Sequence, residues 1–147
     1  MRILLDTSLI RDPRAVALLA RGALQLMIDV NVQMMRAHGP RVFPPLYKSG
    51  IKFGPEPWQG KFEEFAPAIK VLARGWGDCD DLVLYRVAEL IVFGDRLSGS
   101  PPEQASPRIY GRDPGARGGR MMMHAQVRRE NGLVEDPSRL LPRVRTS

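Results

Sequence analysis

Apolar side chains recur every three to four positions over a long segment near the start of the chain, which predicts an amphipathic helix. We expect it to begin at Asp12-Pro13, because Asp can cap free backbone amides and Pro fits the first helical position. Gly39-Pro40 should end it. The side chains predicted to form its buried stripe are Val16, Leu19, Ala23, Met27, Val30 and Met34. Those predicted to face outward are Arg14, Arg21, Gln25, Asp29 and Arg36.

A second apolar segment predicts a helix that begins at Asp78, runs to about Phe93 and is closed by Gly94. Two charged residues in it, Arg86 and Glu89, are expected to point away from the core. The side chains expected to form its buried face are Leu82, Val83, Val87, Leu90 and Ile91.

The last third of the chain contains a pattern typical of a β-hairpin. Met121–Arg129 predicts a strand, Asn131-Gly132 predicts the turn, and Leu133–Asp136 predicts the returning strand. Pro137 should end that strand, and Ile3–Leu5 can form a further short one. The pattern therefore predicts an α+β fold with two helices packed on a small antiparallel sheet.

Three regions lack a periodic pattern. Residues 40–67 are rich in proline and aromatic side chains, and they could either line a groove for an extended ligand or wrap rigidly over the core. Ser98–Gly119 holds four prolines and five glycines, which predicts a long loop. Residues 140–147 are expected to form a basic tail.

Composition narrows the class of protein. A chain of 147 residues with 44% hydrophobic and 26% charged residues is predicted to form one compact domain over residues 1–147. One cysteine excludes an internal disulfide framework and a multi-cysteine zinc site. The apolar runs are shorter than a membrane span requires, and Met1–Leu5 is too short for a signal peptide core. A reduced, cytoplasmic setting is expected.

The net charge of +6 comes mostly from arginine. From Arg108 onward there are nine arginines and four acidic residues. Such a surface could meet nucleic acid or an acidic partner, but the basic residues are scattered and do not alternate with aromatic ones. An ordinary solvated surface is therefore favoured over nucleic-acid binding.

Three residues suggest a catalytic triad. Cys79 falls in the first turn of the second predicted helix, where unpaired amides and the helix dipole favour the thiolate. His124 falls on a strand and could accept the thiol proton, and Asp136 on the next strand could hold the imidazole. The Cys79 backbone amide is a natural oxyanion donor.

The hairpin register decides whether His124 and Asp136 can meet. In a two-residue turn, Glu130 pairs with Leu133, so the sequence numbers of each pair add to 263. Asp136 then opposes Val127 and lies on the face away from His124. In a three-residue loop with Gly132 in the left-handed region, the numbers of each pair add to 262 and Asp136 opposes Gln126 on the face of His124. The triad requires the second register.

The acidic residues around the cysteine have several interpretations. Asp78, Asp80 and Asp81 would raise the pKa of the Cys79 thiol, against the helix dipole. They could serve mainly as helix caps. A calcium site is the weaker alternative, and no cofactor is expected otherwise.

The run Arg74–Leu82, with Gly-Asp-Cys-Asp-Asp at its centre, resembles the nucleophile motif of the transglutaminase-like cysteine proteinase superfamily. His124–Val127 and Glu135–Ser138 resemble the histidine and aspartate blocks of the same superfamily, so the likeness covers about residues 70–140. Pro45–Gly50 is similar to small transglutaminase-like proteins encoded by tailed phages and prophages.

This resemblance implies a transglutaminase-like, papain-like core with Cys79 as nucleophile, His124 as general base and Asp136 as orienting acid. It implies hydrolysis of a peptide or amide through a thioester, or transamidation by the same intermediate. Trp76, Gln59 and Tyr47 are the candidate oxyanion or substrate-contacting side chains.

The alternative that the resemblance implies is a non-enzymatic head, neck or tail protein of a phage-type particle. The expected partners are a protein or peptide substrate and other phage structural proteins, with neither membrane nor nucleic acid. The expected location is the cytoplasm, or the virion if a phage encodes the protein.

Overall fold

The structure is a computed structural model that describes residues 3–5, 11–54, 63–112 and 122–145. These residues form a mixture of helices and strands, which confirms the predicted α+β class. The elements along the chain are β1 (Ile3–Leu5), α1 (Pro13–His38), the 3-10 helix η1 (Leu46–Lys48), β2 (Lys52–Phe53), β3 (Glu63–Phe65), α2 (Ala68–Arg74), β4 (Trp76–Gly77), α3 (Cys79–Val92), β5 (Ser106–Arg112), β6 (Met122–Arg128), β7 (Val134–Glu135) and α4 (Pro137–Leu140).

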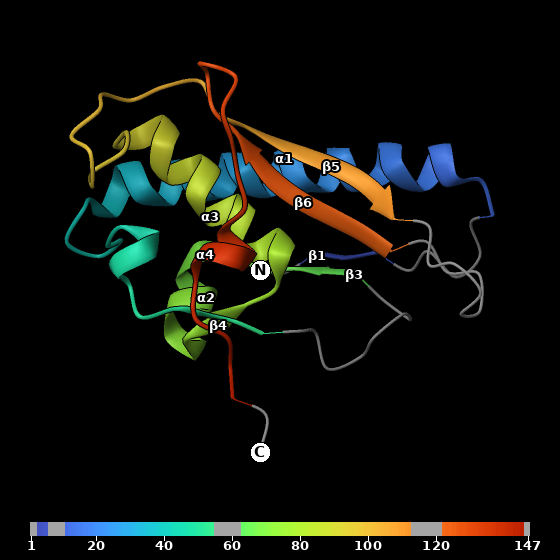
Figure 1. Ribbon diagram of the computed structural model, residues 1–147, viewed down its shortest axis with the longest axis horizontal. Coiled ribbons are helices and arrows are strands. Elements are labelled where there is room, and N and C mark those ends of the chain that lie inside the picture. The colour runs from blue at the N-terminus through green and yellow to red at the C-terminus, as the bar shows by residue number, and fades with distance from the viewer. Residues whose placement is uncertain (1–2, 6–10, 55–62, 113–121, 146–147) are drawn as a thin grey trace.

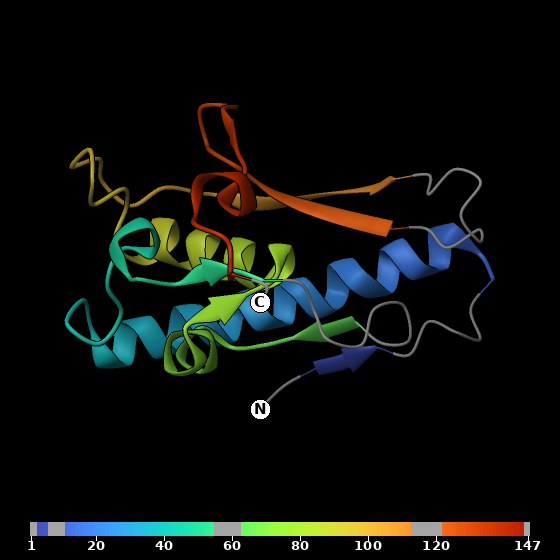
Figure 2. The same cartoon turned by 60° about the horizontal axis from the view of Figure 1, so that its bottom comes forward.

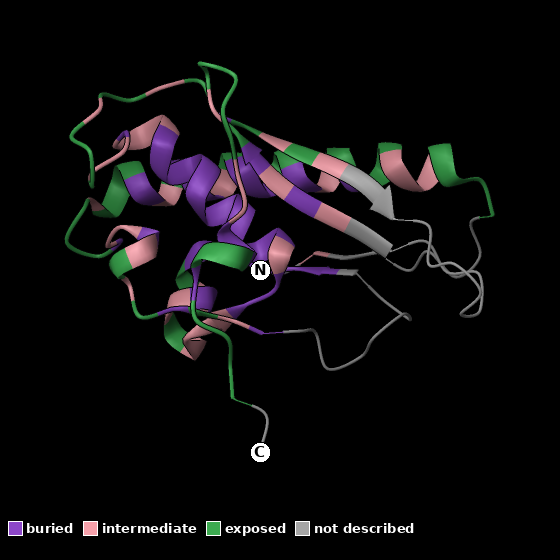
Figure 3. Ribbon diagram, viewed as in Figure 1, coloured by how far each residue is buried: buried purple, intermediate pink, exposed green. Residues whose placement is uncertain are grey.

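Helix α3 lies at the centre of the molecule. It packs against α1 on one side and against β6 on another, and the two views show it between α1 and the β5–β6 ribbon (Figures 1 and 2). Every residue from Asp80 to Leu90 is buried, which is expected of a helix surrounded by other elements (Figure 3). The predicted packing of the cysteine-bearing helix on a small antiparallel sheet is confirmed.

The predicted ends of α1 are confirmed, and its predicted buried stripe is right in part: Met27 is buried, and Ala23, Val30 and Met34 pack partly buried against the core. Asp12 caps the helix by accepting a hydrogen bond from the Arg14 amide at 2.9 Å, and Gly39 ends it. Leu19 is 47% exposed and Leu26 is 53% exposed, so apolar residues lie on more than one side of α1 and periodicity alone does not select the packed face. The buried residues are Ala20, Leu24, Met27, Ile28, Asn31, Val32 and Met35.

Helix α1 is long and apolar enough to cross a membrane, judged by length and composition alone. The sequence did not predict this, because its uninterrupted apolar runs are shorter than a membrane span. Core helices of soluble proteins pass the same test, and the buried residues of α1 face α3 and the strands β1 and β3. The property therefore gives no location for the protein.

The antiparallel sheet has the order β5-β6-β7, and β5 corrects the prediction of a loop over residues 98–119. Seven residues of that region, Ser106–Arg112, pair with β6. Pro107 is tolerated because β5 is an edge strand, where one amide needs no partner. Residues 113–119 lie outside the described part of the chain.

Within residues 40–67, the described segments support the wrapping alternative. Leu46 and Phe65 are fully buried in the core, and β3 pairs with β1. Helix α2 follows directly and was not predicted. Its first amide, that of Ala68, donates to the buried Asn31 side chain of α1 at 2.8 Å, so the cap comes from a distant segment.

The predicted basic tail over residues 140–147 is wrong in its first half. Leu141 is buried, the Phe53 amide donates to the Pro142 carbonyl at 2.7 Å, and the Val144 amide donates to the Phe53 carbonyl at 2.8 Å. Backbone pairing to β2 therefore holds this segment. Residues 146–147 lie outside the described part of the chain.

Two glycines after α3 allow a matched stability test. Gly94 and Gly99 both have a φ of 76°, but a Cβ at Gly94 would lie 2.2 Å from the Ser100 carbonyl oxygen, whereas one at Gly99 meets nothing within 4 Å. We expect Gly99→Ala to cost about 1 to 2 kcal/mol of unfolding free energy from its backbone conformation alone. Gly94→Ala should lower the unfolding free energy, measured by urea unfolding, by clearly more than Gly99→Ala does, because the backbone of residues 100–101 must move. Equal losses would contradict this reading.

Candidate active site

Cys79 is the first residue of α3 and is half-buried. The preceding residue, Asp78, is the N-cap, and it forms a capping box with Asp81: the Asp81 amide donates to Asp78 Oδ1 at 3.0 Å. Gly77 permits this close turn, since a Cβ there would lie 3.0 Å from the Cβ of Asp81. The Gly-Asp-Cys sequence thus places the thiol at the positive end of a buried helix.

The capping interpretation of the acidic residues is supported for Asp78 and Asp81. Asp81 is 2% exposed, accepts from the Ala66 amide at 2.9 Å and forms an ion pair with Arg74. Burial raises the pKa of Asp81, and the negative charge of Asp78 raises it further. Among the described residues, no group of three or more metal-ligating side chains is arranged to hold a metal ion.

Asp80 is the acidic residue that touches the thiol. It is buried, and the Cys79 thiol donates to its Oδ1 at 3.8 Å. A carboxylate that accepts from a thiol stabilises the protonated form, so Asp80 opposes the effect of the helix dipole.

The hairpin adopts the register that the triad requires. Val127 pairs with Glu135 and Arg128 with Val134, so paired numbers add to 262. The Arg129 amide donates to the Leu133 carbonyl at 2.7 Å, which closes a three-residue loop, and Gly132 has a φ of 88°. Of the two registers that the sequence allows, the structure has the one with the three-residue loop.

This register brings His124 and Asp136 together. His124 Nε2 lies 2.7 Å from Asp136 Oδ2, while Asp136 Oδ1 accepts from the Ser138 hydroxyl at 2.6 Å. Burial alone would raise the pKa of Asp136, but hydrogen bonds from Ser138, His124 and Gln126 outweigh it and lower the pKa. The carboxylate is therefore ionised at neutral pH and can orient the His124 imidazole.

The three candidate catalytic residues lie on elements that touch one another. Helix α3, which begins with Cys79, packs against β6, which carries His124, and against α4, which begins directly after Asp136. In Figure 1 the start of α3 lies next to α4. This arrangement has the chain order and element types of a Cys-His-Asp site.

The three candidate oxyanion residues have different surroundings. The Tyr47 hydroxyl donates to Glu135 at 3.2 Å, and burial, followed by the charge of Glu135, raises its pKa. Trp76 lies on β4 with the Arg74 guanidinium 3.9 Å from its ring centroid. Tyr47 and Trp76 thus have packing partners of their own. Gln59 lies outside the described residues.

The prediction that Arg86 and Glu89 point away from the core is wrong. Arg86 is 2% exposed and Glu89 is fully buried, and they form an ion pair at 3.1 Å. Arg86 Nε also donates to Glu135 at 2.5 Å, which joins α3 to the strand before Asp136. A signal was present in the sequence: a helix that is apolar on all sides is buried, and charges within it must be paired.

Comparison with known proteins gives no match. No family model matches the sequence, and neither a curated protein nor a solved structure matches it. The function is therefore argued from the chemistry of the site.

Proposed function

We propose that this protein is a cysteine-dependent acyl-transfer enzyme with a transglutaminase-like core, acting most simply as a peptidase. The observation that carries the proposal is the 2.7 Å contact between His124 on β6 and Asp136, the N-cap residue of α4. Both β6 and α4 pack against the cysteine-bearing helix α3. A carboxylate held against an imidazole is the arrangement that activates a nucleophile in triad enzymes.

The proposed reaction has two steps. His124 takes the thiol proton of Cys79, and the sulfur attacks the carbonyl carbon of the amide. The tetrahedral oxyanion is stabilised by the Cys79 backbone amide at the start of α3. When the C–N bond breaks, His124 gives its proton to the leaving amine and a thioester remains. Water then attacks the thioester in a peptidase, or a second amine attacks it in a transamidase.

The test is the pH dependence of Cys79 alkylation by iodoacetamide, followed by intact mass. In the wild type we expect a midpoint well below the unperturbed thiol value of about 8.5. His124→Ala should move the midpoint upward, because the imidazolium no longer stabilises the thiolate. His38→Ala is the matched control, since His38 is exposed at the end of α1, and it should leave the midpoint unchanged.

A second candidate function is a non-enzymatic component of a phage-type particle with the same core. The contact between the Cys79 thiol and Asp80 favours it, because this carboxylate stabilises the unreactive thiol. A midpoint at or above about 8.5, unchanged by His124→Ala, would contradict the enzyme and favour this candidate.

A further inference from the structure

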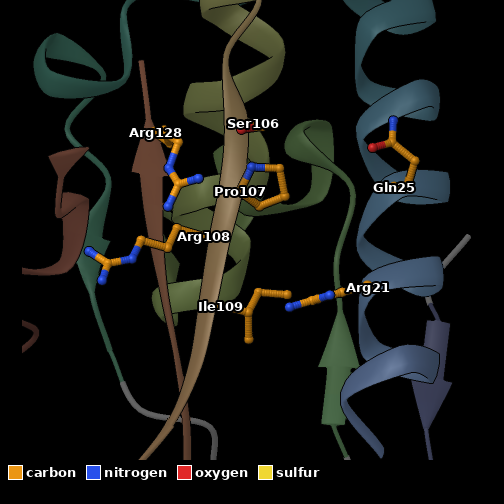
Figure 4. Close-up of a pocket in the computed structure, with 7 residues that line it drawn as sticks. All are labelled: Arg21, Gln25, Ser106, Pro107, Arg108, Ile109 and Arg128. Atoms are coloured by element: carbon orange, nitrogen blue, oxygen red, sulfur yellow. The ribbon is translucent and has the colours of Figure 1, made fainter. Parts of the chain in front are cut away.

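A groove of about 540 Å³ lies between α1 and the edge of the sheet, away from any role assigned above. Arg21 and Gln25 of α1 line one side, residues 106–109 of β5 line the other, and Arg128 of β6 completes it (Figure 4). Its volume is within the range of natural ligand sites.

The groove follows the free edge of a strand. Side chains of neighbouring strand residues point to opposite faces of a sheet, so four consecutive residues can line one groove only if it runs along the strand edge. Within the described part of the chain, β5 is an edge strand whose one neighbour in the sheet is β6. The groove therefore has the shape of an extended chain.

The lining is strongly basic. Among the described residues that line it are three arginines and no acidic side chain. Arg21 and Arg128 are exposed, and neither is within ion-pair distance of a carboxylate among the described residues. Arg74, Arg86, Arg96 and Arg129, in contrast, all form ion pairs with carboxylates.

We propose that this groove binds an extended, acidic peptide segment. Guanidinium groups bind carboxylates with two parallel hydrogen bonds, and Arg21 of α1 and Arg128 of β6 can engage separate acidic side chains of one chain. Single-stranded nucleic acid is disfavoured, because its binding sites use aromatic side chains for base stacking and the described residues of this lining include none.

The site is close to the proposed catalytic residues but does not depend on them. Arg128 and His124 lie on the same face of β6, four residues apart, which is about 13 Å. A peptide anchored in the groove could extend toward His124. Binding itself requires no chemistry at Cys79, so it is measured in Cys79→Ala.

The experiment measures fluorescence anisotropy of a labelled peptide of alternating Glu and Thr, at low ionic strength, on the full chain carrying Cys79→Ala. The comparison peptide has Gln in place of every Glu. The test variant adds Arg21→Gln and Arg128→Gln. The matched control adds Arg36→Gln and Arg41→Gln, which remove the same charge from exposed positions outside the groove.

We expect the Glu peptide to bind, the Gln peptide not to bind, and the affinity to fall about tenfold or more in the test variant. The control variant should bind as the parent does. Equal losses in both variants would overturn the proposal by showing a non-specific charge effect, and so would absence of binding. Stronger binding of oligothymidylate or of inorganic phosphate in the same groove would overturn the ligand class. Since Cys79 is absent throughout, none of these results bears on catalysis.

Discussion

Replacing Arg86 by Met should lower the free energy of unfolding by about 3 to 5 kcal/mol, because removing one member of a buried ion pair leaves its partners charged and buried. Arg86 is 2% exposed and contacts Glu89 at 3.1 Å, Asp95 at 3.5 Å and Glu135 at 2.5 Å. Its guanidinium also lies 4.9 Å from the Tyr47 ring centroid. Burial alone would lower the pKa of Arg86, but Glu135 and Glu89 outweigh it and raise the pKa, so the side chain is a permanent cation.

Urea unfolding followed by circular dichroism measures this loss. The slope of the unfolding free energy against urea concentration should be the same as in the wild type. Arg128→Met is the matched control: it removes an exposed arginine of the neighbouring strand and should change stability by less than about 0.5 kcal/mol. Arg86→Met with Glu89→Gln should recover part of the loss, since the buried negative charge is removed as well. A loss no larger than that of Arg128→Met would show that the ion pairs contribute nothing.

The ion pairs around Arg86 share Asp95 and Glu135 with a second arginine, Arg129. Arg129 contacts Glu103 at 2.6 Å, Asp95 at 3.6 Å and Glu135 at 3.5 Å. Together the two arginines join α3, the segment after it and the hairpin. Because Glu135 precedes Asp136, these contacts fix the strand that delivers Asp136 to His124.

Features set by local chemistry could be predicted from the sequence. Asp12 and Asp78 cap the two long helices, as their positions before apolar segments indicated. A tight turn with Gly132 in the left-handed conformation was indicated, but the sequence left two registers open, and the structure has the three-residue turn. This turn set the register, and the register brought His124 and Asp136 within 2.7 Å.

Features set by distant contacts could not be predicted in the same way. β5 forms within a segment rich in proline and glycine because β6 supplies its hydrogen-bonding partner. Helix α2 takes its cap from Asn31, 37 residues earlier in the chain. The burial of Arg86 depends on Glu135, 49 residues away. None of these partners is near in sequence, so periodicity and propensity carry no information about them.

Replacing Asp136 by Asn should slow the reaction of Cys79 by about 100-fold or more while leaving stability within about 1 kcal/mol of the wild type. The two oxygens of Asp136 have separate roles. Oδ1 accepts from the Ser138 amide at 3.2 Å and caps α4, and Asn caps helices as well as Asp does. Oδ2 holds His124, and an amide nitrogen in its place removes the negative charge that stabilises the imidazolium.

The measurement is the rate of Cys79 acylation by p-nitrophenyl acetate at neutral pH, with the acetyl group located by intact mass. Because the pKa of Asp136 is lowered, its carboxylate is ionised throughout the neutral range, and the wild-type rate should show no change from Asp136 titration above about pH 5. The folded-state pKa lies below the unfolded one, so the stability that this carboxylate contributes is present above about pH 4 and is lost as the pH falls through the lowered value.

Asp12→Asn is the matched control, since it makes the same change at the cap of α1, and it should leave the acylation rate unchanged. His124→Ala should be as slow as Asp136→Asn, and the double variant no slower than either, because the two residues act as one unit. If Asp136→Asn reacted as fast as the wild type while unfolding at the same urea concentration, the carboxylate would be a helix cap alone. The 2.7 Å contact with His124 would then be structural, and the proposed catalytic role of Asp136 would be wrong.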